Sequence, residues 1–376
     1  MIPKVDPLFY LDVLCRDGKV PRKLKSSSKI VTKAIKQGCV NILGWSHRKY
    51  IPRLVLCNMA VEKGRLDVLQ WAKDNGYPWN KDTCAYAVKN NHLEVLQWLI
   101  ANGCPWNRSV SAYAARKGHL HILKWLRSIG CQWSPFVCPH AAKKGHLEVL
   151  KWARANGCPW NGETCSSAAI AGHLEVLKWL LSQGCPCDEE TSSVAALGGH
   201  LEILQLLRSQ GCPWNEDTCR DAAEGGHLEV LQWARANGCP WDEETCAYAA
   251  KKGHLEILQW ARSQGCPWHE RTCTEAAYEG HLEVLQWVRS QGCPWDEDVC
   301  IYAAAGGHLE TLKWSRANGC PWNENTCSSA AANGHLKVLK WARANGCPWN
   351  RQTCTEALKQ GHQEIFQWAR ANGCPE

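Results

Sequence analysis

Asn215 to Trp241 read NEDTCRDAAEGGHLEVLQWARANGCPW, and this 27-residue stretch decides the fold because the chain repeats it without insertion or deletion. Eleven copies run from Asn80 to Glu376. The histidine of the motif marks the period, since it recurs at His92, His119, His146, His173, His200, His227, His254, His281, His308, His335 and His362. Such a period is typical of a solenoid, in which each unit buries its apolar face only against its neighbours.

Each copy is expected to form two helices joined by tight turns. Asn215 is a good N-cap, and the first helix is predicted to run through the Ala-Ala pair to the Gly-Gly pair. His227 opens a second helix, whose Leu and Trp residues follow helical spacing, and Gly238 ends it. No segment shows the alternation of a strand, so the sequence predicts an all-α fold.

Two other repeated positions have structural interpretations. We expect the histidine to form a hydrogen bond across the turn at the start of its own second helix. Glutamate recurs two residues after it, as at Glu229, and arginine recurs six residues after the glutamate, as at Arg235. Because six residues is not a spacing that pairs side chains within one helix, we expect these charges to pair between copies.

The chain contains 24 cysteines and 22 tryptophans, and nearly all of them are repeat positions. In a reducing compartment cysteine behaves as a small buried hydrophobe, so we expect packing and no disulfide framework. The recurring Cys-x6-Cys-x7-His spacing, as in Cys212, Cys219 and His227, is unlike that of structural zinc sites. We therefore expect no metal and no cofactor. No phosphate-binding loop or nucleophile set occurs, so an enzyme is not expected.

The beginning of the chain differs from the repeats. Residues 1–60 carry 12 Lys and Arg against 3 Asp and Glu, which leaves about −2 of the whole chain's +7 net charge for residues 61–376. We expect an N-terminal cap with a degenerate repeat over residues 1–52 and an array of about twelve repeats over residues 53–376. Apolar runs are too short for a membrane helix, and residues 1–14 make a poor secretory signal. A cytosolic or nuclear monomer without membrane contact is expected.

The motif Ala-Ala-x-x-Gly-His-Leu-Glu-Val-Leu, followed by Gly-Cys, resembles the ankyrin repeat over residues 53–376. A standard ankyrin unit has about 33 residues, and the six that are missing here fall where the family forms a β-hairpin. The resemblance implies a helical-hairpin solenoid with shortened or absent β-hairpin loops. The 27-residue repeat is similar to the short, Trp- and Cys-rich ankyrin subtype of protists and large DNA viruses. It also implies protein–protein recognition without catalysis, in the role of a scaffold or adaptor.

Three positions on the first helix vary between copies, namely the residue before the Ala-Ala pair and the two after it. Their i, i+3, i+4 spacing places them on one helix face, which the resemblance puts on the concave surface. Tyrosine beside arginine and lysine favours a binding hot spot, so we predict that an acidic segment of a partner protein docks there. The candidate partner-binding residues are Tyr86, Lys89, Tyr113, Arg116, Lys117, His140, Lys143, Lys144, Tyr248, Lys251 and Lys252.

Other interpretations of the same residues remain open at this stage. Surface positions can drift without a ligand, and a repeat array can serve as a mechanical spacer. The runner-up function is nucleic-acid binding by the basic N-terminal cap and the Tyr/Lys-rich first repeats, because stacking combined with cations suits single strands. The slightly negative charge of residues 61–376 argues against nucleic acid.

Overall fold

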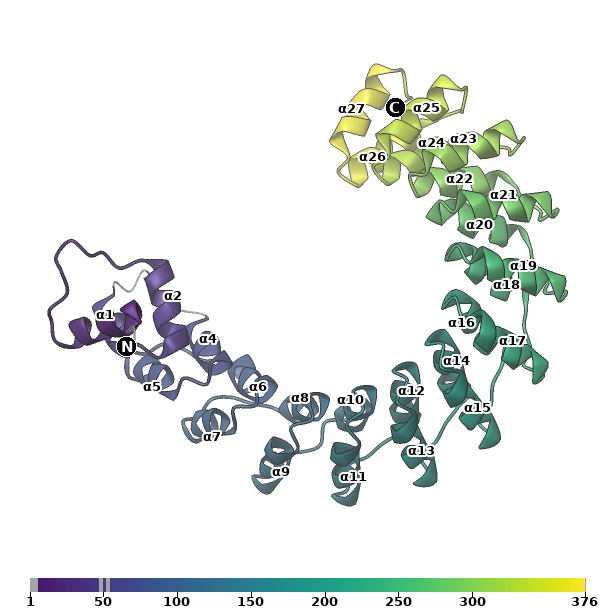
Figure 1. Ribbon diagram of the computed structural model, residues 1–376. Coiled ribbons are helices and arrows are strands. Elements are labelled where there is room, and N and C mark those ends of the chain that lie inside the picture. Colours follow the sequence, from purple (N-terminus) through teal and green to yellow (C-terminus); the bar gives the residue numbers. More distant parts are fainter. Residues whose placement is uncertain (1–5, 47–49, 52–54, 376) are drawn as a thin grey trace, which may run out of the picture. The chain divides into compact units, whose positions relative to one another are not determined.

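The computed structural model describes residues 6–46, 50–51 and 55–375, which contain 27 α-helices and no strand (Figure 1). The predicted all-α helical solenoid is confirmed within these residues, and the segments that join successive copies contain no β-hairpin there. The predicted boundary between residues 52 and 53 lies outside the described residues and stays a prediction.

The chain divides into two compact units, Met1–Ser167 and Ala168–Glu376. The first unit contains α1 (Pro7–Arg16), α2 (Ser28–Gln37), α3 (Val40–Trp45), α4 (Leu56–Glu62), α5 (Leu66–Asp74), α6 (Lys81–Lys89), α7 (Leu93–Ala101), α8 (Ser109–Lys117), α9 (Leu120–Ser128), α10 (Val137–Lys143) and α11 (Leu147–Ala155). The division between the units falls within α12 (Gly162–Ile170).

The second unit continues the alternation of first and second helices. It contains α13 (Leu174–Ser182), α14 (Glu189–Leu197), α15 (Leu201–Ser209), α16 (Glu216–Glu224), α17 (Leu228–Ala236), α18 (Glu243–Lys251), α19 (Leu255–Ser263), α20 (Glu270–Glu279), α21 (Leu282–Ser290), α22 (Glu297–Ala305), α23 (Leu309–Ala317), α24 (Glu324–Ala332), α25 (Leu336–Ala344), α26 (Arg351–Lys359) and α27 (Gln363–Ala371). Within this unit the first helices α14 to α26 form one row, on the inner side of the unit's bend (Figure 1).

The local sequence explains where the first helices begin. Asn80 accepts a hydrogen bond from the backbone N–H of Asp82 at 2.9 Å, and its own N–H donates to Oγ1 of Thr83 at 3.1 Å. Asp188 caps α14 in the same way, through the N–H of Thr191 at 3.0 Å. These reciprocal bonds satisfy backbone donors that the first turn leaves unpaired. Asn215 also stands at the N-cap of α16, as predicted, but its side chain makes no capping hydrogen bond there.

The core of each copy lies between its two helices and those of its neighbours. Leu231 and Ala234 on α17 are buried together with Cys239, which follows the helix. The backbone N–H of Cys239 donates to the carbonyl of Ala234 at 3.0 Å, and the intervening Gly238 has φ of +84°. This left-handed glycine ends the second helix as predicted and turns the chain toward the next copy.

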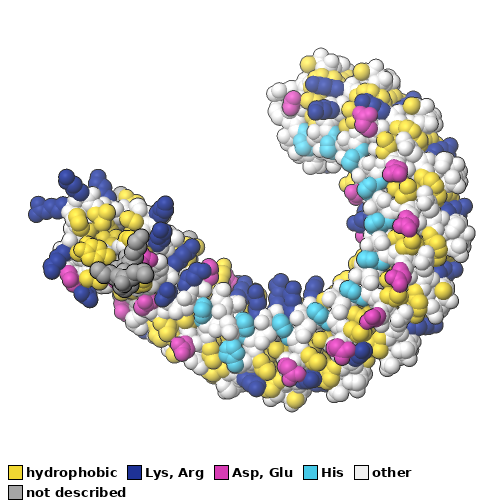
Figure 2. Space-filling view, in the orientation of Figure 1, with side chains coloured by type: hydrophobic (Ala, Val, Ile, Leu, Met, Phe, Trp, Pro, Cys, Tyr) yellow, Lys and Arg dark blue, Asp and Glu magenta, His cyan; other side chains and the backbone are white. Residues whose placement is uncertain are grey.

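The histidines connect neighbouring copies, which differs from the expected bond within one turn. Nε2 of His227 lies 3.1 Å from the carbonyl oxygen of Leu197, which is 30 residues earlier and ends the first helix of the preceding copy. The same contact joins His92 to Glu62 at 3.3 Å in the first unit. The imidazole reaches the preceding copy because it stands at the N-cap of the second helix, beside the C-terminus of the neighbouring first helix. Within each unit the histidines form a row (Figure 2).

The expectation that the repeated arginines pair with glutamates between copies is wrong for the described residues. Nη1 of Arg262 donates to the carbonyl of Cys266 at 2.8 Å, and its guanidinium lies 4.2 Å from the ring centroid of Trp268. The arginine ends the second helix, so it reaches the segment that follows rather than a glutamate in the first turn. Some of the glutamates pair instead with a lysine three residues later, as Glu148 does with Lys151 at 2.9 Å.

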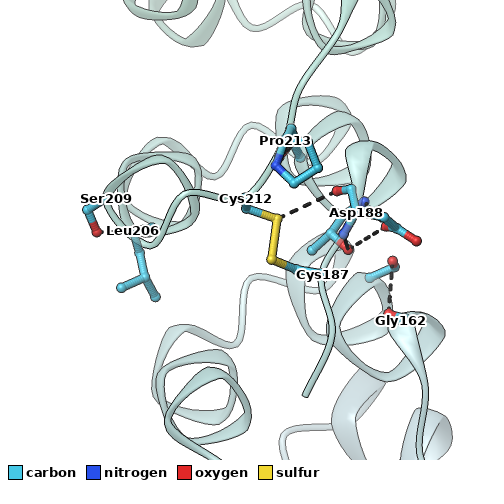
Figure 3. The surroundings of a disulfide bond; sticks show 10 residues. Gly162, Cys187, Asp188, Leu206, Ser209, Cys212 and Pro213 are labelled. Atoms are coloured by element: carbon cyan, nitrogen blue, oxygen red, sulfur yellow. Dashed lines mark hydrogen bonds between the residues drawn. A yellow bond between two sulfur atoms is a disulfide. The ribbon is translucent and has the colours of Figure 1, made fainter. Parts of the chain in front are cut away.

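One connector between copies replaces this arrangement by a disulfide bond. In most other copies the connector tryptophan packs against the tryptophan in the second helix of the following copy, with ring centroids 6.0 Å apart for Trp268 and Trp287. Cys187 stands at the connector position, and leucine occupies both the arginine position and the second tryptophan position, at Leu181 and Leu206. Cys187, which lies just before α14, forms a disulfide bond with Cys212, which follows α15 (Figure 3). The expectation of a free thiol is therefore wrong for Cys212, whereas the other 22 cysteines are outside disulfide bonds.

Candidate protein-binding surface

The structure brings five of the predicted residues to one cavity in the first unit. Variable positions of α6 and α8, together with Lys144 just after α10, line a cavity of about 530 Å³, and the repeat histidine His146 completes its wall. We call the predicted residues at this cavity the basic surface: Lys89, Tyr113, Arg116, Lys117 and Lys144. Lys and Arg side chains gather beside α8 and α10 in Figure 2.

Tyrosine rings hold one of the lysines in place. Nζ of Lys89 lies 4.4 Å from the ring centroid of Tyr113 and 5.4 Å from that of Tyr86. An ammonium group at such distances is attracted by the negative face of the ring, and it retains free N–H donors. The lysine on α6 is therefore directed toward the next copy, where Arg116 lies.

The basic surface has no internal counter-charge. Among the described residues, no carboxylate oxygen lies within 4 Å of the charged nitrogens of Lys89, Arg116, Lys117 or Lys144. Nε2 of His146 is bonded to the carbonyl oxygen of Arg116 at 3.3 Å, which helps to fix the end of α8. A cluster of cations without carboxylates attracts an anionic group from outside the chain.

The environment of His140 favours its neutral form. Burial lowers the pKa of His140, and the positive charge of Arg116 lowers it further, against a hydrogen bond with the backbone of Ala112. The ring of Phe136 stacks on His140 at a centroid distance of 5.7 Å and is 49% exposed. His140 therefore supplies an aromatic surface rather than a charge, and Phe136 extends it.

The predicted residues do not form a single site. Tyr86, His140 and Lys143 are on the same helices but outside the lining of the cavity. Lys251 and Lys252 belong to the second unit, where they are paired with Glu275 at 3.6 Å and Glu224 at 3.4 Å.

Tyr248, also in the second unit, has the guanidinium of Arg220 5.4 Å from its ring centroid. Lys251 and Lys252 thus differ from the lysines of the basic surface in having carboxylate partners, whereas Tyr248 has a cation beside its ring as Tyr113 does. The assignment of all eleven residues to partner binding stays a prediction.

Two residues of the first unit, His146 on the wall of the cavity and Phe136 beside His140, are not among those predicted from the sequence. His146 is a repeat position, so the sequence pattern indicates only a scaffold role for it. Phe136 stands where other copies carry a polar or charged residue, such as Asp82 or Asp217. The comparison of copies that singled out the variable positions reveals Phe136 as well, because it is the single phenylalanine at that position in the array.

The Cys-x6-Cys-x7-His groups serve other contacts. Cys212 is in the disulfide, Cys219 is fully buried, and His227 is bonded to a backbone carbonyl of the preceding copy. The described residues include no group of three or more His, Cys, Asp or Glu side chains placed to hold a metal ion.

The helices in the described part of the chain are at most ten residues long. No helix there combines the length and the apolar character that crossing a bilayer requires.

A comparison with protein families agrees with the repeat architecture. A family model described as "Ankyrin repeats (many copies)" matches residues 84–127, which extend from α6 into α9. No curated protein sequence matches the chain. Among solved structures, the ankyrin repeat domain of human ASB11 is 18% identical, with a TM-score of 0.35, over 43% of this chain and 85% of that one. Residues 84–127 thus match the ankyrin-repeat family, and the unit that they contain recurs in phase to the end of the array.

Proposed function

We propose that the chain is a non-enzymatic protein-interaction module that binds an acidic segment of a partner protein on the basic surface. Ankyrin repeats generally mediate protein–protein interaction. The observation that carries the proposal is the set of four cations around one cavity, none of which has a carboxylate within 4 Å among the described residues. The role that follows is that of a scaffold or adaptor, which holds one protein for use by another.

The energetics favour an extended acidic segment over a single carboxylate. One exposed ion pair contributes on the order of 0.5 kcal/mol, because water and salt screen it. Several pairs, together with contact on the rings of Tyr113 and Phe136, are needed to reach the roughly 8 kcal/mol of a micromolar complex. A segment with acidic residues spaced to meet α6, α8 and α10 provides these contacts together.

The test compares two variants that each lose four positive charges. In the surface variant Lys89, Arg116, Lys117 and Lys144 are replaced by Gln. The matched control carries Gln at four lysines of second helices, namely Lys124, Lys151, Lys178 and Lys313. The probe is a fluorescent twelve-residue peptide rich in Glu, and its affinity is measured by anisotropy at fixed salt.

We expect the surface variant to bind the Glu peptide at least about tenfold more weakly than the control, with both proteins melting as the unaltered chain does. Equal binding by the two variants would remove the basic surface from the proposal. A single-stranded oligonucleotide serves as the second probe. Tighter binding of the oligonucleotide than of the Glu peptide, lost in the surface variant, would replace the proposed protein ligand by nucleic acid.

A further inference from the structure

A second cavity, also of about 530 Å³, lies in the second unit, and its chemistry differs from that of the basic surface. The first helices α18, α20 and α22 form it. Tyr278 and Tyr302 line it together with Glu270, Glu275 and Asp298, so its wall combines two aromatic rings with three carboxylates.

The two tyrosines present their rings to solvent. Tyr278 on α20 is 43% exposed, and Tyr302 on α22 is 44% exposed. Their ring centroids lie 6.0 Å apart with the planes at 81°, so the edge of one ring meets the face of the other. Large aromatic side chains rarely remain this exposed as a pair unless they serve recognition.

The cations near this cavity are already neutralised. Arg271, which also lines the cavity, is paired with Glu244 at 2.7 Å and with Glu275 at 3.1 Å. Lys251 is paired with Glu275 at 3.6 Å. No positive charge on the wall is therefore available to an anionic ligand.

The carboxylates, by contrast, are in excess. Glu270 and Asp298 on the wall and the neighbouring Glu279 have no Lys or Arg nitrogen within 4 Å among the described residues. Burial raises the pKa of Asp298, and the negative charges of Asp296 and Glu297 raise it further. A cation placed in the cavity relieves this repulsion, so the charge of the site is complementary to a basic ligand.

We propose that this cavity binds a lysine or arginine side chain from a basic segment of a partner protein. The cationic group lies against the rings of Tyr278 and Tyr302, within reach of the carboxylate of Asp298. The methylene groups of the ligand side chain cover the tyrosine rings while its charge meets the carboxylates. The inference goes beyond the acidic ligand of the basic surface and does not rest on it, because the residues, the unit and the sign of the charge all differ.

The test measures binding of a twelve-residue fluorescent peptide, with Lys and Arg spaced by Gly and Ser, to the full chain. Replacing both Tyr278 and Tyr302 by Ala is expected to weaken binding about tenfold or more, since the cation loses both rings. Asp298→Asn is expected to weaken it several-fold. The matched control is Glu256→Gln, which removes one negative charge from an exposed second-helix position and is expected to leave the affinity unchanged.

The two proposed sites are separated by exchanging variants and probes. The variant with Gln at Lys89, Arg116, Lys117 and Lys144 is expected to bind the basic peptide as the unaltered chain does. Equal affinity of the double tyrosine variant and the unaltered chain for the basic peptide would overturn the inference. So would concentration-dependent self-association, seen by analytical ultracentrifugation and lost in Tyr278→Ala/Tyr302→Ala, because a second copy of the chain would then be the occupant. Circular dichroism melting shows that each variant is folded.

Discussion

Glycine and histidine act together where one copy meets the next. Gly226 has φ of +81°, and a Cβ atom at this position would lie 2.8 Å from Cε1 of His254 in the following copy. Nε2 of His254 in turn lies 3.2 Å from the carbonyl oxygen of Glu224. The glycine both permits the turn and leaves room for the ring that bonds the neighbouring helix. This shared contact explains why the two residues repeat as a pair.

Gly226→Ala is expected to lower the free energy of unfolding by more than the cost of placing alanine in a left-handed backbone conformation. A Cβ in this conformation costs about 1–2 kcal/mol, and displacement of His254 adds the loss of a hydrogen bond, about 1 kcal/mol. Urea unfolding measures the change. The control is Gly238→Ala, with φ of +84° and no atom within 4 Å of the added Cβ. Equal losses in the two variants would show that the histidine contact contributes nothing.

Some features of the candidate surface could be predicted by comparing the repeat copies, and others could not. The variable positions and their common helix face follow directly from aligning the copies. Whether a lysine is paired depends on the copy beside it: Lys252 meets Glu224, whereas the copies around Lys117 carry no carboxylate at the corresponding positions. The alignment of the copies therefore indicates which lysines can be paired, provided that each copy is compared with the copies directly before and after it. The exposure of the tyrosine rings and the presence of the cavities could not be predicted from the sequence, because both depend on how the side chains are arranged in space.

At the scale of the elements, the connector between copies exists in two chemical forms. The common form holds arginine over tryptophan and packs two tryptophans edge to face, whereas one connector has Leu181, Cys187, Leu206 and a disulfide. Leu181, Cys187 and Leu206 occupy the three positions that belong to the same connector, and the arginine column has a second exception at Ile100. The disulfide bond was not predicted because Cys187 stands at the connector position, where the other copies carry tryptophan, and not at a repeated cysteine position.

Reduction of the disulfide is expected to destabilise the second unit. The bond closes a segment with a sequence separation of 25 residues, for which loop-closure entropy predicts roughly 3 kcal/mol. Thermal melting with and without dithiothreitol measures the loss. The control variant restores the common connector with Leu181→Arg, Cys187→Trp and Leu206→Trp, and its melting is expected not to respond to the reductant. An unaltered chain that melts identically in both conditions would contradict this.

At the scale of the whole molecule, each copy depends on its immediate neighbours. First helices pack on first helices of adjacent copies, and the histidine contacts and the cysteine core follow the same order. The 27-residue period therefore sufficed to predict the type and order of the helices from Asn80 onward. It could not predict the division into two units, because the sequence continues in phase through residues 167 and 168.

Removing one whole copy is expected to preserve the fold. Deletion of residues 323–349 joins Trp322 to Asn350 and keeps the connector sequence, so the neighbours meet through the same contacts. We expect helicity per residue to be unchanged in circular dichroism, with a small decrease in melting temperature. Deletion of residues 323–336 is the out-of-phase control, since it removes α24 and leaves the apolar face of α25 without its partner. An in-phase variant that unfolds as readily as this control would contradict the modular arrangement.

The Cys187–Cys212 bond also determines how the chain responds to mechanical force. When the two ends are pulled apart, helices held by noncovalent contacts unravel and lengthen the tether, but the covalently closed segment of 25 residues does not extend. At about 3.5 Å per extended residue, the oxidised chain reaches a contour length roughly 80 Å shorter than the reduced chain. The missing extension distinguishes the two redox forms in single-molecule stretching.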